Sequence, residues 1–98
     1  MFDQLFDIIE DRKKNPQPGS YTNFLLNAGE DEILKKVGEE AVEIILAAKN
    51  QGDERLVEEV SDLLYHVFVL LSFRGLQPAQ IAAELERRHQ PKAPKPES

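Results

Sequence analysis

The hydrophobic residues of this chain recur every three to four positions in five separate stretches. That spacing is typical of amphipathic α-helices, and no stretch alternates apolar and polar residues long enough to predict a strand. Residues that break or cap helices separate the stretches, notably the segment Asn15 to Gly19. The predicted helices run from Phe2 to Lys14, from the N-cap Ser20 through Leu26, from Asp31 to about Asn50, and from the cap Asp53 to about Arg74. A final amphipathic helix starts at Gln77-Pro78 and includes Ile81, Ala82 and Leu85.

These helices predict an all-α fold, a small helical bundle of four to five helices. The chain has 98 residues, which suffices for one domain with a modest core, and we assign residues 1–90 to it. Residues 91–98 carry three prolines interspersed with lysines, so they are predicted to form a disordered tail.

The two long helices are apolar on more than one side. With about 100° of rotation per residue, Val42 and Leu46 lie nearly opposite Val37, and Val69 and Phe73 lie opposite Val60. A helix that is apolar on two sides is usually buried on two sides, so we expect a symmetric homodimer that completes the bundle. The expected core stripes comprise Ile33, Leu34, Val37, Ala41, Ile44, Ile45 and Ala48, and Leu56, Val57, Val60, Leu63, Leu64, Val67, Leu70 and Leu71.

Each long helix also carries two acids one turn apart, next to its core stripe. Glu40 and Glu43 form the first pair, and Glu59 and Asp62 form the second, with His66 on the same side. Four carboxylates beside a core are costly unless a cation neutralises them, and oxygen ligands suit a hard dication such as Mg²⁺. From spacing alone, a solvated charged face remains an alternative.

Composition narrows the class of protein. The net charge of −6 argues against general binding to nucleic acids or anionic membranes. The chain has no cysteine, which excludes a disulfide framework and a thiolate metal site. No segment has the length and apolarity of a membrane span or a secretory signal, so we expect a cytoplasmic protein.

Three segments carry a family resemblance: SYTNFLL (20–26), KKVGEEAVEIILAAKN (35–50) and EEVSDLLYHVFVLL (58–71). In this order they resemble phosphoribosyl-ATP pyrophosphohydrolase, the family that performs the second step of histidine biosynthesis and belongs to the MazG-like all-α nucleotide pyrophosphohydrolases. The resemblance extends from Phe2 to about His89. It implies that the Mg²⁺ ligands are Glu40, Glu43, Glu59 and Asp62. Many family members carry a basic residue where this chain has Glu32.

The resemblance also implies the reaction. Phosphoribosyl-ATP is hydrolysed between its α- and β-phosphates to phosphoribosyl-AMP and pyrophosphate. Glu39 or Glu43 is then the candidate general base that orients the attacking water. We expect His66 to hydrogen-bond Asp62 one turn back and to support the ligands without binding metal, and Tyr65 to lie at an interface.

Basic and hydroxyl-bearing residues are the candidates for substrate binding. Lys36 lies on the same side of its helix as the acids and is the best candidate for a phosphate contact. The loop after the first helix is a second candidate region, because loops on a rigid scaffold often bind ligands. The full set of candidates is Lys35, Lys36 and Lys49, with Arg12, Lys13, Ser20, Tyr21 and Thr22.

Other functions compete with this one. A house-cleaning hydrolase of ordinary or damaged nucleoside triphosphates would use the same four acids. A non-catalytic helical dimerisation module would need no metal. A di-iron carboxylate bundle is more distant, because neither long helix has a Glu-x-x-His pair. In the leading interpretation the substrate is phosphoribosyl-ATP, and the product passes to a separate phosphoribosyl-AMP cyclohydrolase.

Overall fold

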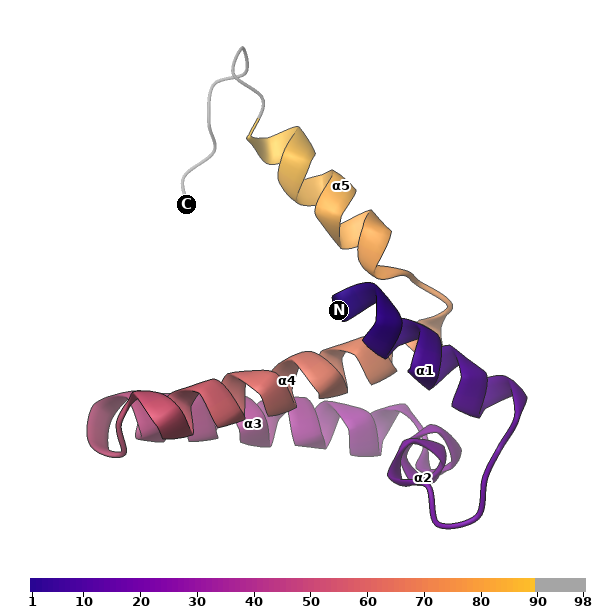
Figure 1. Cartoon of the computed structure of the whole chain (residues 1–98), viewed down its shortest axis with the longest axis horizontal. Helices are drawn as coiled ribbons and strands as arrows, with labels where there is room; N and C mark the ends of the chain where they lie inside the picture. Colours follow the sequence, from indigo (N-terminus) through magenta and orange to yellow (C-terminus); the bar gives the residue numbers. More distant parts are fainter. Residues whose placement is uncertain (90–98) are drawn as a thin grey trace.

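The computed structural model describes residues 1–89, which form five α-helices and no strand. Two long helices, α3 and α4, run antiparallel as a hairpin, and α1 and α2 pack near one end of it (Figure 1). The predicted all-α bundle and its five helices are therefore confirmed, while the predicted tail lies outside the described residues. The helices are α1 (Phe2–Lys14), α2 (Tyr21–Ala28), α3 (Glu30–Asn50), α4 (Asp53–Arg74) and α5 (Pro78–Arg88).

The predicted ends of the first four helices hold to within two residues, and α5 begins at Pro78 as predicted. The Ser20 hydroxyl accepts a hydrogen bond from the main-chain N–H of Asn23 at 3.1 Å, which makes Ser20 the N-cap of α2 as expected. Gly75 ends α4 in the left-handed conformation at φ +74°, which disfavours other residues. The cap predicted at Asp53 is wrong, because Gly52 occupies the N-cap position and Asp53 lies in the first turn.

The core lies where α1 and α2 pack against the α3–α4 hairpin. Ile9, Leu25, Ile33 and Val69 are fully buried there, and the ring of Phe6 meets the edge of Phe68 at 6.1 Å. The expectation that Val69 faces a second copy is wrong, because Val69 belongs to the same buried cluster as Ile9 of α1.

The inner face of α3 is rotated toward the acids compared with the predicted stripe. Ile33 and Ala47 are buried and Val37 and Ile44 are half-buried, and Glu40 lies on the same face of the helix. The other predicted core residues of α3, which are Leu34, Ala41, Ile45 and Ala48, are exposed. On α4, Val57 and Val60 are likewise exposed. Glu40 consequently lies within the inner face of α3 and not at its border.

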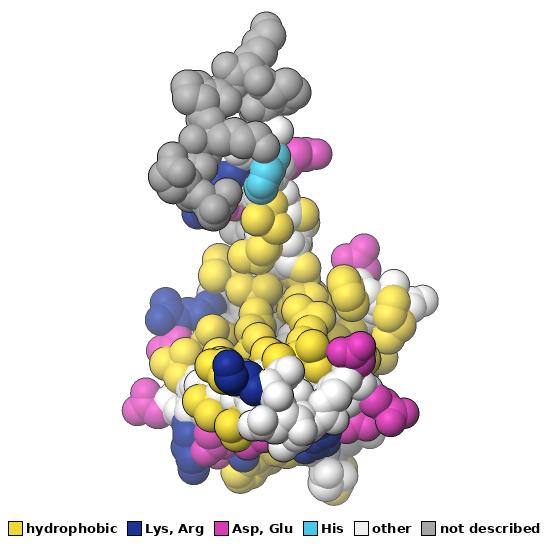
Figure 2. Space-filling view, turned by 90° about the vertical axis from the view of Figure 1, so that its left-hand side faces the viewer, with side chains coloured by type: hydrophobic (Ala, Val, Ile, Leu, Met, Phe, Trp, Pro, Cys, Tyr) yellow, Lys and Arg dark blue, Asp and Glu magenta, His cyan; other side chains and the backbone are white. Residues whose placement is uncertain are grey.

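Helix α5 stands away from the rest of the chain (Figure 1). None of its residues is buried, and Ile81 and Leu85 are about half exposed. Viewed from the end of the hairpin, hydrophobic side chains cover the upper part of the body and continue onto the arm above it (Figure 2). Among the described helices, none combines the length and the apolar character needed to cross a bilayer.

Candidate functional site

The acids of the two long helices converge in one pocket between α3 and α4. Glu40, Glu59 and Asp62 each place one carboxylate oxygen within 4.8 Å of the others. Glu43 and Glu39 line the same pocket, outside this close group of three. Three of the four predicted metal ligands are therefore brought together, and the fourth lies beside them.

Glu40 is the most perturbed member of this group. Its atom Oε1 is buried without a hydrogen-bond partner. Burial, hydrogen bonding to Glu59 and the nearby negative charge of Asp62 raise the pKa of Glu40 to about 7. A buried carboxylate oxygen near like charges is costly unless a cation or a proton compensates it. The donor set is entirely carboxylate oxygen, so its chemistry fits a hard dication such as Mg²⁺.

His66 supports this cluster through the main chain. It is buried, and its Nδ1 lies 2.8 Å from the carbonyl oxygen of Asp62. A carbonyl only accepts, so Nδ1 carries the hydrogen, and in the neutral ring Nε2 accepts from the Tyr21 hydroxyl at 3.1 Å. The expected bond from His66 to Asp62 is present, although it goes to the main chain and not to the carboxylate.

Aromatic side chains of α2 gather at this end of the acid pocket. The ring of Tyr21 lies nearly parallel to the rings of Phe24 and Tyr65, with centroids 6.1 and 6.2 Å away. Tyr65 is half-buried and its hydroxyl hydrogen-bonds to Thr22, so it contacts α2 of its own chain, and its place at an interface stays a prediction. The exposed faces of Tyr21 and Phe24 border a second hollow, lined also by loop residues 17–20 and Asn27.

Asn23 holds the loop that leads into α2. Its side-chain amide donates to the main-chain oxygen of Arg12 at 2.8 Å and accepts from the N–H of Gln17 at the same distance. These bonds fix the approach of the chain to Ser20 and so place Tyr21. Sequence reasoning did not select Asn23, because an asparagine in a helix gives no sign of a bond to a distant loop.

Of the predicted cationic contacts, Lys36 lies nearest to the acids. Its ammonium is 3.6 Å from Glu39, and its positive charge opposes the burial that raises the pKa of Tyr21. The charge of Lys36 therefore acts both on an acid of the pocket and on Tyr21. Lys35 and Lys49 are exposed on the same helix.

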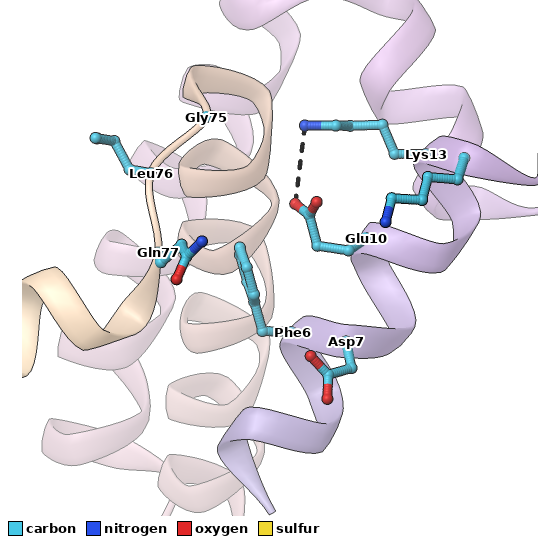
Figure 3. Close-up of a pocket in the computed structure, with 8 residues that line it drawn as sticks. Phe6, Asp7, Glu10, Lys13, Gly75, Leu76 and Gln77 are labelled. Carbon is cyan, nitrogen blue, oxygen red and sulfur yellow. Dashed lines mark ion pairs between the residues drawn. The ribbon is translucent and has the colours of Figure 1, made fainter.

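Lys13 and Arg12 have other partners. Lys13 donates to the carbonyl oxygen of Ser72 at 2.7 Å, and Figure 3 shows its ion pair with Glu10, across from the connection between α4 and α5. Ser72 lies ten residues beyond Asp62, or about 15 Å along the helix. Arg12 pairs with Asp11 at 3.1 Å. Lys13 thus lies in a different pocket from the acids.

Arg55 is a residue of the acid pocket that sequence reasoning missed. It lies one turn before Glu59, and its Nη2 is 2.6 Å from a carboxylate oxygen of that residue. Arg55, Glu59, Asp62 and His66 follow one another at spacings of four, three and four, so they share one face of α4. That periodicity was the available signal.

A comparison with protein families matches residues 2–89 to phosphoribosyl-ATP pyrophosphohydrolase. The chain belongs to this family. Similar curated proteins, each named phosphoribosyl-ATP pyrophosphatase, come from Pelotomaculum thermopropionicum, at 51% identity over 91% of both chains, and from Lactiplantibacillus plantarum, at 54% identity over 88% of this chain and 81% of the other. A protein of the same name from Bacillus cereus is 51% identical over 90% of this chain and 82% of its own length.

The match of this phosphoribosyl-ATP pyrophosphohydrolase domain spans every residue of the acid pocket and of the aromatic group. The family assignment predicted from the three sequence segments is therefore confirmed. Membership makes the chain a hydrolase domain and leaves the role of each side chain to be argued from its contacts.

Proposed function

We propose that this protein hydrolyses phosphoribosyl-ATP to phosphoribosyl-AMP and pyrophosphate, the second step of histidine biosynthesis. The observation that carries the proposal is the convergence of Glu40, Glu59 and Asp62 on one pocket, in a chain that belongs to the matching family. The names of the relatives, which agree over most of the chain, support the same substrate. Neither comparison favours a hydrolase of ordinary nucleoside triphosphates.

The proposal includes Mg²⁺ as the cofactor. Glu40, Glu59 and Asp62 would hold it, and Glu43, at the edge of the same pocket, is the fourth candidate. The buried, unpartnered oxygen of Glu40 supports this assignment, because a dication would neutralise the charge that the protein itself leaves uncompensated. When bound, Mg²⁺ supplies charge neutralisation for the phosphates and lowers the pKa of water.

The remaining acids are candidates for proton transfer. Glu43 and Glu39 line the pocket beside the close group of three, so either carboxylate can accept a proton from the attacking water. We favour Glu43, because Glu39 is exposed and already faces the Lys36 ammonium. No covalent intermediate is required, since water attacks the phosphorus directly.

The aromatic end of the pocket is the proposed place of the nucleoside. Tyr21 presents a ring that is 45% exposed, and it is fixed from below by stacking on Tyr65 and by its bond to His66. Such a rigid, open ring can stack with a base. Ser20 and Thr22, the other predicted substrate contacts of this segment, also hold α2 through the bonds to Asn23 and Tyr65. Lys36, whose charge acts on Tyr21 and Glu39, is the proposed contact for the phosphates.

We further propose that the active form is a homodimer. Large apolar side chains remain exposed along α3, α4 and α5, and a contiguous apolar surface of this kind marks an interaction site. The exposed residues include Val42, Ile45 and Leu46 of α3, Val57 and Val60 of α4, and Ile81 and Leu85 of α5. A partner copy that covers them would also give α5 the packing that its own chain does not supply.

The biosynthetic role sets the expected context. We propose that the enzyme works in the cytoplasm and releases phosphoribosyl-AMP to a separate cyclohydrolase. The family and the names of the relatives support a biosynthetic enzyme, and this context extends that role.

The test is a pyrophosphate-release assay on phosphoribosyl-ATP with and without Mg²⁺, run beside a panel of dNTPs. We expect turnover of phosphoribosyl-ATP that stops when the metal is chelated, and rescue of a histidine auxotroph that lacks this step. Rapid turnover of dNTPs with none of phosphoribosyl-ATP would instead identify a house-cleaning hydrolase. Binding to a partner with no hydrolysis at all would indicate a dimerisation module.

A further inference from the structure

All residues that line the acid pocket lie in the part of the chain that the structure describes. Arg55 is the only one of them with a positive charge. Its guanidinium uses two nitrogens at once. Nη2 lies 2.6 Å from Glu59 and Nη1 lies 2.7 Å from Glu58. The Arg55 side chain is 49% exposed while the Glu59 side chain is 3% exposed, so a half-exposed guanidinium of the pocket lining pairs with a buried acid.

This pair differs from the other ion pairs within helices of the protein. Arg87 and Arg88 pair with Glu84 on α5, where both partners are exposed and solvent screens the attraction. Glu59 is buried and is a proposed metal ligand, so the guanidinium contacts a carboxylate that the cation would also use. A dication bound to Glu59 would neutralise that carboxylate in place of Arg55. The guanidinium would then be free to pair with another anion.

The planar guanidinium matches phosphate oxygens in geometry and keeps its charge at all working pH values. Arg55 and the aromatic group also lie at opposite ends of the acid cluster. Arg55 and His66 are eleven residues apart on α4, which is about 16 Å along the helix axis, and His66 holds Tyr21. A nucleotide whose base lies at Tyr21 therefore extends its outer phosphates toward Arg55.

We propose that Arg55 binds the pyrophosphate portion of the substrate, the β- and γ-phosphates, and that in the metal-free protein it holds Glu59 in place of the cation. This assignment rests on the proposed function and adds to it the direction in which the substrate lies: nucleoside at α2, leaving pyrophosphate at the turn between α3 and α4. Arg55 thereby contacts the leaving group as its negative charge develops.

The test uses inorganic pyrophosphate as the probe and calorimetry as the readout, so no turnover is needed. Wild type, Arg55→Gln, Arg55→Lys, Lys36→Gln and Glu58→Gln are titrated with Mg²⁺ alone and then with pyrophosphate in saturating Mg²⁺. Glu58→Gln is the matched control, because it removes the exposed partner of Arg55 and leaves the guanidinium in place. Thermal melting confirms that each variant is folded.

We expect Arg55→Gln to weaken pyrophosphate binding by about tenfold or more, the loss typical of a hydrogen bond to a charged group. The pyrophosphate affinity of Arg55→Lys should lie between those of Arg55→Gln and wild type. Lysine keeps the positive charge but loses the planar guanidinium that donates from two nitrogens. Mg²⁺ alone should bind Arg55→Gln as tightly as wild type or more tightly, since a competitor for Glu59 is gone. Glu58→Gln should bind pyrophosphate within about twofold of wild type.

Two outcomes overturn the assignment while leaving the proposed function intact. The first is unchanged pyrophosphate affinity in Arg55→Gln together with weaker pyrophosphate binding in Lys36→Gln. That result would mean that the substrate lies in the pocket in the opposite direction. The second is weaker Mg²⁺ binding in Arg55→Gln, which would make Arg55 a positioning residue for Glu59. If wild type neither binds pyrophosphate with Mg²⁺ nor hydrolyses phosphoribosyl-ATP, the proposed function itself fails.

Discussion

At the scale of single residues, Glu40 has the most perturbed environment of the acid pocket. Its carboxyl group shares a pocket with Glu59 and Asp62, and one of its oxygens is buried without a partner. The folded chain keeps these like charges together at a cost in free energy, because their positions are set by the packing of α3 on α4. A site that is costly without its ligand and relieved by it is what a metal-dependent enzyme requires.

Replacing Glu40 by Gln should separate function from stability. The amide keeps the shape and loses the anionic ligand, so we expect phosphoribosyl-ATP hydrolysis to fall by about 100-fold or more. In the metal-free protein at pH 8 the variant should melt at a higher temperature than wild type, because one of the clustered charges is gone. Pyrophosphate release and thermal denaturation in EDTA measure the two effects. Glu86→Gln, an exposed change on α5, is the control and should alter neither.

The pKa of Glu40 makes metal-free stability depend on pH. Burial and the neighbouring acids raise this pKa from 4.5 to about 7. Between those values the folded state binds more protons than the unfolded state. The contribution of Glu40 to the free energy of unfolding is therefore present below pH 4.5 and is lost as the pH rises through about 7.

The difference in melting temperature between Glu40→Gln and wild type should consequently be small at pH 5 and grow toward pH 8. Thermal denaturation of both proteins in EDTA across this range is the measurement. Parallel curves would show that Glu40 does not titrate in this window.

At the scale of helices, the sequence predicts where each element begins and ends but not how it faces its neighbours. All five helices follow from periodicity and breakers, and Ser20 and Gly75 act as the expected caps. The orientation of α3 could not be predicted in the same way, because its apolar surface covers a wide arc. Ile33 and Ala47 face the protein's own core, whereas Leu34 and Ile45 belong to the outer part of that arc.

The acid cluster and the bond from His66 to Asp62 were predictable, and the support from α2 was not. The spacing of the acids within each helix predicts the cluster of Glu40, Glu59 and Asp62. The bonds from Tyr21 to His66 and from Thr22 to Tyr65 join residues more than 40 positions apart, and no periodicity within a helix reveals them. Arg55 was partly predictable. Its spacing from Glu59 is visible in the sequence, but only the structure shows that the carboxylate it contacts is buried.

The N-cap of α2 offers a test of how an element positions the site. Ser20→Ala removes the acceptor for the N–H of Asn23, so we expect a loss of about 1 kcal/mol in the free energy of unfolding. The KM for phosphoribosyl-ATP should rise because Tyr21 follows directly, while Mg²⁺ affinity should stay unchanged because α3 and α4 hold the acids. Urea denaturation, steady-state kinetics and calorimetry give the three values. Ser20→Thr, which keeps the hydroxyl, should behave like wild type.

At the scale of the whole molecule, the hairpin has two chemically different kinds of exposed surface. The acids gather in one pocket between α3 and α4, while Val42, Ile45 and Val57 present apolar surface to solvent. Hydrophobic side chains also cover part of the body and continue onto the projecting arm (Figure 2). A second copy packed on this surface would brace the two helices that carry the acids, so dimerisation and metal binding become coupled.

Ile45→Glu tests that coupling. Ile45 is 58% exposed in the single chain, so the substitution should change the fold of one protomer little, yet it places a charge within the proposed interface. Losing a central apolar contact and burying a charge should raise the dimer dissociation constant by about 100-fold or more. Sedimentation velocity over a range of concentrations measures this shift. Gln51→Glu adds the same charge at the exposed end of α3 and should leave the dimer intact. Equal sedimentation of Ile45→Glu and wild type as dimers would place the interface elsewhere, and a monomeric wild type would remove the proposed dimer altogether.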